Sequence, residues 1–385
     1  MNKTDIIEAA FQVWGRELFK TTSLSQIAQA LGVTKPALYR HFKNKDDLLE
    51  GMYVYYCDHY MGFMKASYEK AVESRDNNQG ILLMARNLAE YHARHKYLFL
   101  FSLVEVYGDE KRDKDLLEQH WSFLDRGDAY PSQARLITTA IFFLVTLFHK
   151  GRLGPCTGEE EIQRFLSFIE GVISHGLGFD KTLVDALDFE ALEKTGTYPM
   201  PPEGENEALL KAVASAVAEA GPWNASMEMV AHHSGLSKSS LYAHFKNKAD
   251  MLGQMFITEF NRIVDYAELG ASRSGLPAEQ FYLAMAAIAN YLRSRSEILI
   301  ALDWVRTRRL DLGIHAPPSR IYRIFANIEL KEPGGFLTGE TLAQWVLFLI
   351  VNILMRRPEG TSFSEVSNES FRILYRFIVL GIEGW

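Results

Sequence analysis

The sequence contains only two cysteines in 385 residues, Cys57 and Cys156. They form no CxxC pair, so neither a disulfide framework nor a thiolate metal motif is indicated, and a reducing compartment is expected. No apolar run reaches the roughly 18 residues that a helix needs to cross a bilayer. The first residues have the pattern of an amphipathic helix and not of a signal peptide. We therefore predict a cytoplasmic protein with no membrane partner.

The sequence also lacks the motifs of common enzyme classes: no P-loop, GxSxG, HExxH or GxGxxG is present. His92 and His95 are three residues apart and could form one edge of a metal site, but no third ligand has a suitable spacing nearby. The adjacent His232 and His233 point in different directions. We predict no catalytic or metal site and no cofactor, and an all-α enzyme remains the less favoured alternative.

Acidic residues are absent from Lys20–Lys45, although the whole chain has 48 Asp+Glu against 41 Lys+Arg and a net charge of −7. A one-signed stretch of this length predicts a local electropositive surface, which phosphate binding requires. A confined basic patch on an acidic chain argues against a protein that coats nucleic acid generally. The cations of this stretch are Lys20, Lys35, Arg40, Lys43 and Lys45.

The same stretch has the local signals of two short helices joined by a tight turn. Ser23 and Gln26 have the spacing of a capping box, and Gly32 stands where the first helix should end. Thr34 is expected to cap the second helix, which carries Leu38 inward. A capped helix, a glycine turn and a second capped helix predict a helix-turn-helix, whose second helix enters the DNA major groove.

The DNA-facing side of the second helix follows from a rotation of about 100° per residue. With Leu38 inward, Pro36, Tyr39, Arg40 and Lys43 point most nearly away from the core. Arg40 is the expected base reader, and a guanine would suit it. The alternative is a hairpin of two helices with a solvated basic edge. The predicted DNA-binding residues are Ser23, Thr34, Lys35, Pro36, Ala37, Tyr39, Arg40, His41, Lys43 and Lys45.

The motif occurs a second time, at a constant shift, since 235 − 32 = 203 and 248 − 45 = 203. A period this long indicates a duplicated domain and not a solenoid. The copies differ where the first should read DNA, because Arg40 is matched by Ala243. The second set of predicted DNA-binding residues is Ser237, Lys238, Ser239, Ser240, Tyr242, His244, Lys246 and Lys248.

The segment TSLSQIAQALGVTKPALYRHFKNKDDLL resembles the DNA-binding segment of the TetR family of bacterial repressors. The Ile-Ala pair, the Gly-Val-Thr turn, the Leu-Tyr-x-His-Phe run and the Asn-Lys-x-x-Leu helix start stand at the family's spacing, over about fifty residues. The resemblance implies a helical body that binds a small effector and a two-fold dimer on DNA. One chain with two such motifs is therefore expected to be an intrachain pseudo-dimer; a further homodimer is left open.

The expected fold class is all-α, because almost no period-2 alternation is present. The segment GTYPMPPEGEN is rich in proline and glycine and predicts a linker. The predicted domains are a helix-turn-helix domain at 1–47, a helical ligand-binding and dimerisation domain at 48–195, the linker at 196–206, a second helix-turn-helix domain at 207–250 and a second helical domain at 251–385.

The body is expected to contain a long helix from Asn44 towards Ser74, followed by further helices. Two segments, ITTAIFFLVTLF and LAQWVLFLIVNILM, are apolar on nearly every side and should be buried all round. By resemblance they belong to a dimer interface; burial within one half is the alternative. The other predicted helices are near 5–18, 80–95, 96–107, 113–125, 132–150, 159–177, 207–220, 337–356 and 363–383, and one begins at Pro277.

Tyrosines and methionines crowd the long helix, which favours plain core packing over an aromatic effector pocket. The effector-binding residues stay unknown. We predict a transcriptional regulator, a ligand-responsive repressor that binds double-stranded operator DNA of imperfect palindromic sequence. The alternative is a ligand sensor with weakened DNA binding, which Ala243 keeps open for the second half.

Overall fold

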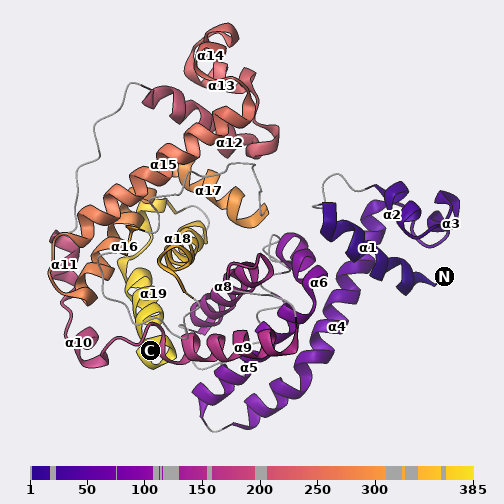
Figure 1. Ribbon diagram of the computed structural model, residues 1–385, viewed down its shortest axis with the longest axis horizontal. Coiled ribbons are helices and arrows are strands. Elements are labelled where there is room, and N and C mark those ends of the chain that lie inside the picture. Colours follow the sequence, from indigo (N-terminus) through magenta and orange to yellow (C-terminus); the bar gives the residue numbers. More distant parts are fainter. Residues whose placement is uncertain are drawn as a thin grey trace. The chain divides into compact units, whose positions relative to one another are not determined.

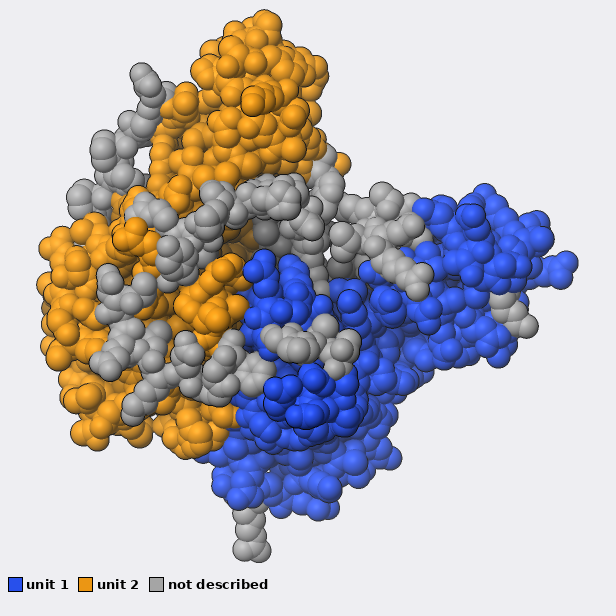
Figure 2. Space-filling model, in the orientation of Figure 1, with its two compact units in different colours: residues 1–170 blue, residues 171–385 orange. Residues whose placement is uncertain are grey.

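The computed structural model describes residues 2–17, 23–74, 76–106, 112, 115, 130–153, 158–195, 206–308, 323–325, 337–356 and 361–385. All regular secondary structure in these ranges is helical, which confirms the all-α fold class. The chain divides into two compact units, residues 1–170 and residues 171–385 (Figure 2).

Unit 1 begins with a head of three helices that gather at the N-terminal end of a long helix (Figure 1). The head encloses a small core in which Ile6, Phe11, Ile27 and Leu38 are buried. The predicted long helix is confirmed, with Asn44 as its N-cap. The helices are α1 (Lys3–Glu17), α2 (Leu24–Ala30), α3 (Lys35–Tyr39) and α4 (Lys45–Glu73).

The body of unit 1 is built around α5, which packs against both α4 and α8. The predicted helix at 113–125 lies outside the described residues, apart from a helical Asp115. Unit 1 ends at Glu170, inside the last helix. The elements are α5 (Asn77–Arg94), α6 (Lys96–Phe101), a π-helical turn (Ser102–Val106), α8 (Tyr130–His149) and α9 (Glu159–His175).

Unit 2 repeats the head and the long helix (Figure 1). Its first helix runs regularly to Ala220 and then bends at Gly221, whose φ of 74° favours glycine, before Pro222. This bend agrees with the predicted helix end at residue 220. The helices are α12 (Glu207–Asn224), α13 (Met227–Ser234), α14 (Lys238–His244) and α15 (Lys248–Ala271).

The body of unit 2 packs α16 against α15, and α18 against α16 and α17. Pro277 is the first residue of α16, as predicted. The elements are α16 (Pro277–Ser294), α17 (Ser296–Arg308), α18 (Gly339–Met355), a 3-10 turn (Phe363–Glu365), α19 (Asn368–Leu380) and a second 3-10 turn (Gly381–Gly384).

Residues 171–195 group with unit 2, whereas the sequence places them in a first body that ends at residue 195. They include two short helices that the sequence analysis did not predict, α10 (Lys181–Asp185) and α11 (Phe189–Thr195). The Phe189 ring lies 4.7 Å from the Tyr282 ring, between centroids. The predicted linker lies outside the described residues except for Asn206.

The two apolar segments form the core of α8 and α18, as their composition predicts. Ile137, Ile141 and Val145 of α8 are fully buried, and so are Trp345 and Leu349 of α18. Their role in a dimer interface stays a prediction. Within the described ranges, no helix has both the length and the hydropathy that crossing a membrane requires.

Candidate nucleic-acid interface

The first helix-turn-helix, residues 23–45, is held by local hydrogen bonds that its sequence predicts. The Ser23 hydroxyl oxygen accepts the Gln26 N–H at 3.3 Å, and the Gln26 side chain accepts the Ser23 N–H at 2.5 Å, which confirms the capping box. Gly32 has a φ of 65°, as expected of a glycine after a helix end.

Thr34 occupies the N-cap position of α3, but its side chain makes no capping hydrogen bond, so the predicted cap is correct in position only. Pro36 has no N–H to donate, and the Ala37 N–H donates to the Thr34 carbonyl at 3.0 Å.

The second helix-turn-helix, residues 226–248, has the same turn and a fuller set of caps. Gly235 has a φ of 69°. The Ser226 hydroxyl accepts the Met229 N–H at 3.3 Å, and the Ser237 hydroxyl accepts the Ser240 N–H at 3.1 Å. Its second helix, α14, is also longer than α3, by two residues at the C-terminal end in the repeat alignment (His244 against Tyr39, shifted by 203).

The outward faces of α3 and α14 lie where the helical rotation predicts. Leu38 and Leu241 are fully buried, while Tyr39 and Tyr242 are 45% and 53% exposed. Arg40 is exposed, and Ala243 holds the same place in the second motif. The other predicted DNA-binding residues are exposed as well, except for Ala37, His41, Lys45 and Lys248, which are half-buried.

The starts of α4 and α15 share one geometry. The Asn44 side chain accepts the Asp47 N–H at 2.8 Å, and Asp47 accepts the Lys43 N–H at 2.8 Å. Asn247 and Asp250 repeat these bonds at 2.9 and 2.8 Å. Burial lowers the pKa of Lys248. Each long helix therefore begins directly after its own recognition helix, and the first lysine of the long helix is half-buried.

The electrostatics of the two motifs differ at one position that the sequence analysis missed. Glu228, the second residue of α13, forms an ion pair with Lys238, the first residue of α14. In the first motif the matching residues are Ser25 and Lys35, and the Lys35 ammonium lies 5.9 Å from the centroid of the Tyr39 ring. The signal was present in the sequence, because aligning the two motifs at the shift of 203 places Glu228 against Ser25.

The geometry defines two helix-turn-helix domains, each with an exposed recognition helix. A family model described as bacterial regulatory proteins, tetR family, matches residues 6–52 and residues 209–255. The chain therefore belongs to the TetR family of DNA-binding transcriptional regulators and carries the family's DNA-binding region twice.

A second candidate site is a cluster of tyrosine and histidine side chains in the body of unit 1. Tyr56 and Tyr60 are fully buried, and their rings stack with centroids 5.7 Å apart. The buried His92 faces the Leu88 carbonyl through Nδ1 at 2.8 Å and the Tyr56 hydroxyl through Nε2 at 3.1 Å. A carbonyl only accepts, so Nδ1 carries the proton and Nε2 accepts from Tyr56. These residues pack as core, which is the interpretation that the sequence favoured.

The possible metal edge at His92 and His95 does not extend to a metal site in the described part of the chain. No group of three or more histidine, cysteine or carboxylate side chains there could hold an ion. His92 uses both ring nitrogens in hydrogen bonds, as described above.

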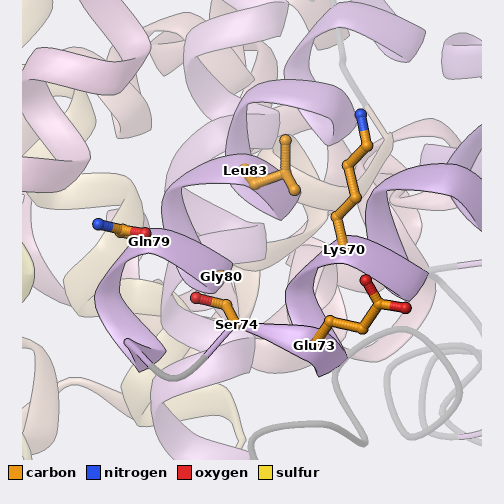
Figure 3. Close-up of a pocket in the computed structure, with 6 residues that line it drawn as sticks. All are labelled: Lys70, Glu73, Ser74, Gln79, Gly80 and Leu83. Carbon is orange, nitrogen blue, oxygen red and sulfur yellow. The ribbon is translucent and has the colours of Figure 1, made fainter.

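An open pocket of about 440 Å³ lies where α4 ends and α5 begins (Figure 3). Lys70, Glu73 and Ser74 contribute from the α4 side, and Gln79, Gly80 and Leu83 from α5. Lys70, Glu73 and Gln79 are exposed. The pocket lies at the C-terminal end of α4, the helix that begins next to the first recognition motif.

Proposed function

We propose that this TetR-family regulator is a ligand-responsive repressor that acts in the cytoplasm and binds an imperfectly palindromic operator with both of its helix-turn-helix motifs. The observation that carries the proposal is the pair of exposed recognition helices. Each presents a lysine and a tyrosine at matching positions, Lys35 and Tyr39 in α3 and Lys238 and Tyr242 in α14.

In this proposal α3 and α14 enter the major groove, and Arg40 supplies the contact with the most base information, since guanidinium groups bond guanine at two points. Lys45 and Lys248 meet phosphate, with help from the backbone N–H groups at the starts of α4 and α15. The remaining contacts come from Ser23, Thr34, Lys35, Pro36, Ala37, Tyr39, His41 and Lys43, and from Ser237, Lys238, Ser239, Ser240, Tyr242, His244 and Lys246.

Joining two DNA-binding regions in one chain makes the second binding event intramolecular, so affinity no longer depends on dimerisation between chains. It also allows the two regions to recognise different sequences. Arg40 and Ala243 occupy one position of the repeat, so the half-sites should differ at the base pair that this position faces. Half-sites are expected one helical turn apart or a multiple of it.

For the ligand response we propose that an effector tilts the long helix of its unit and thereby moves the recognition helix. The position of the open pocket supports this proposal. Lys70, Glu73 and Ser74 line it at the end of α4, and α4 begins at Lys45, next to the recognition motif. The chemical identity of the effector stays open.

A ligand sensor with weakened DNA binding is the second candidate. Two observations favour it for unit 2: Ala243 carries no base-reading group, and Lys238 is engaged by Glu228. Both leave the first motif intact, so this candidate predicts binding to a single half-site.

Selection of bound sequences from random duplex DNA with the full chain tests these proposals. Two unequal half-sites are the expected result, and a perfect palindrome as the best site would contradict the asymmetry. Gel-shift titration of the DNA flanking the gene, over a salt series, should show tight binding with a steep salt slope. A variant with Lys35, Tyr39 and Arg40 changed to Ala keeps Leu38 and the core and serves as the control. A single half-site supports the sensor candidate for unit 2.

A further inference from the structure

We propose that Glu228 weakens the binding of the second helix-turn-helix to DNA phosphate, so that the first motif contributes more of the affinity for DNA than the second. This inference rests on the proposed function, because it concerns the same DNA interface. It assigns a role to a residue that lies outside the recognition helix.

The first step is the position of Glu228. It is the second residue of α13, where the dipole of the helix would otherwise favour an anion such as a phosphate. Its side chain is 62% exposed, so the carboxylate is on the surface and not part of a core. A DNA phosphate that approaches this helix start meets a negative charge first.

The second step is the partner of Glu228. The carboxylate pairs with the ammonium of Lys238, and hydrogen bonding between them lowers the pKa of Glu228 and raises that of Lys238. Both groups therefore stay charged at neutral pH. A lysine held by a carboxylate offers less to phosphate, because the carboxylate competes for its donors and repels the DNA backbone.

The third step is the comparison with the first motif. Ser23–Lys45 contains Lys35, Arg40, Lys43 and Lys45 and no acid, a formal charge of +4. Ser226–Lys248 contains Lys238, Lys246 and Lys248 with Glu228, a formal charge of +2. One unit of the difference comes from Arg40 against Ala243, and the other from Ser25 against Glu228.

The test is the full chain with Glu228→Ser, which installs the residue of the first motif, and with Glu228→Gln, which keeps the side-chain length. Both should bind operator and non-specific duplex roughly three- to tenfold more tightly, with a salt slope steeper by about one. The reciprocal Ser25→Glu should weaken binding by a similar factor. Thermal melting checks that each variant is folded.

Glu219→Gln is the matched control. Glu219 is an exposed acid of the same head and pairs with His233, so its removal changes the net charge equally at another place. An equal gain from Glu219→Gln would overturn the site-specific role of Glu228, as would no gain from Glu228→Ser in a chain that binds DNA. If neither wild type nor variant binds any duplex, the proposed function fails together with this inference. Binding by the variant alone would support the inference in its strongest form.

Discussion

Beneath the first head, the Tyr56 hydroxyl lies 3.1 Å from Nε2 of the buried His92, and Nδ1 of His59 lies 3.0 Å from the Tyr91 hydroxyl. Beneath the second head, the matching position to Tyr56 is Glu259, by the same shift of 203 residues. Glu259 is fully buried and accepts a hydrogen bond from Tyr291 at 2.5 Å. At corresponding positions of the same pair of helices, unit 1 therefore has hydrogen-bonded aromatic rings and unit 2 has buried ions.

Four charged side chains of unit 2 pair with one another and form the buried ion network: Glu207, Glu259, Arg262 and Arg295. Arg262 and Arg295 each pair with both carboxylates. Glu207 is the first residue of α12, so the network ties the second head to α15 and to the end of α16. α5 and α16 are both 18 residues long, and their residue numbers are offset by 200. Arg295 is therefore the residue of unit 2 that corresponds to His95 of unit 1.

The comparison shows that the same arrangement of helices accommodates two kinds of buried polar cluster. In unit 2 two carboxylates and two guanidinium groups balance, and each carboxylate receives at least three hydrogen bonds or ion pairs. Such a network is costly to break, because a partner left behind is a buried charge without compensation. In unit 1 the corresponding residues are tyrosines and histidines that form no such network, and burial lowers the pKa of His95.

The largest expected effect is on the buried ion network. Glu259→Gln leaves two guanidinium groups with a single carboxylate and should lower the free energy of unfolding of unit 2 by about 3–5 kcal/mol. Tyr56→Phe, at the matching position of unit 1, removes one neutral hydrogen bond and should cost unit 1 about 1–2 kcal/mol. Native-state hydrogen exchange, followed peptide by peptide, separates the two units.

The control for this pair is Glu369→Gln. Glu369 is an exposed carboxylate beside Arg372, and such surface pairs contribute about 0–1 kcal/mol. Equal losses from Glu259→Gln and Tyr56→Phe would remove the energetic distinction between the two buried polar clusters.

The second prediction concerns the two recognition helices. Arg40→Ala should relax the preference at one base pair of the first half-site and cost about 1–3 kcal/mol of specific binding. Ala243→Arg, the reciprocal change, should sharpen the preference at the matching base pair of the second half-site. Binding to a panel of single-base operator variants measures both. Lys45→Ala should weaken all sequences alike, and a base-selective loss would refute its assignment to phosphate.

The sequence predicted the heads well because their signals are short in range. A serine with a glutamine three residues later, and a glycine after the last turn, determine α2 and its turn through neighbours in the chain. The same holds for Asn44 and Asn247 at the starts of the long helices.

The contacts that escaped prediction join distant positions. Glu207 and Arg295 are 88 residues apart, and no local pattern relates them. α11 has seven residues, and its Glu193 side chain accepts from Arg372, 179 residues away. Helices this short depend on such packing and not on their own propensity.

The third prediction compares the caps of the two recognition helices. Ser237→Ala should lower the stability of unit 2 by about 1 kcal/mol, because the hydroxyl caps the Ser240 N–H. Thr34→Ala should cost unit 1 much less, because Thr34 makes no capping bond. Ser23→Ala and Ser226→Ala are positive controls, since each hydroxyl accepts the N–H of the third residue of its helix, and each change should lower stability measurably. A loss from Thr34→Ala as large as that from Ser237→Ala would show that its cap forms in solution.

The smallest expected effect is a pH dependence confined to unit 1. Burial, with the neighbouring His59 and Arg94, lowers the pKa of His95 from its ordinary value of 6.5. As the pH falls below 6.5, the unfolded chain takes up the proton first, so unit 1 loses stability until the lower folded pKa is passed. Arg295 at the matching position does not titrate, and the lowered pKa of Glu207 makes unit 2 lose stability only below about pH 4.5. Hydrogen exchange at pH 7 and pH 5 should therefore show weakening in unit 1 alone, and His95→Gln should reduce it. Equal weakening of both units over this interval would refute the assignment to His95.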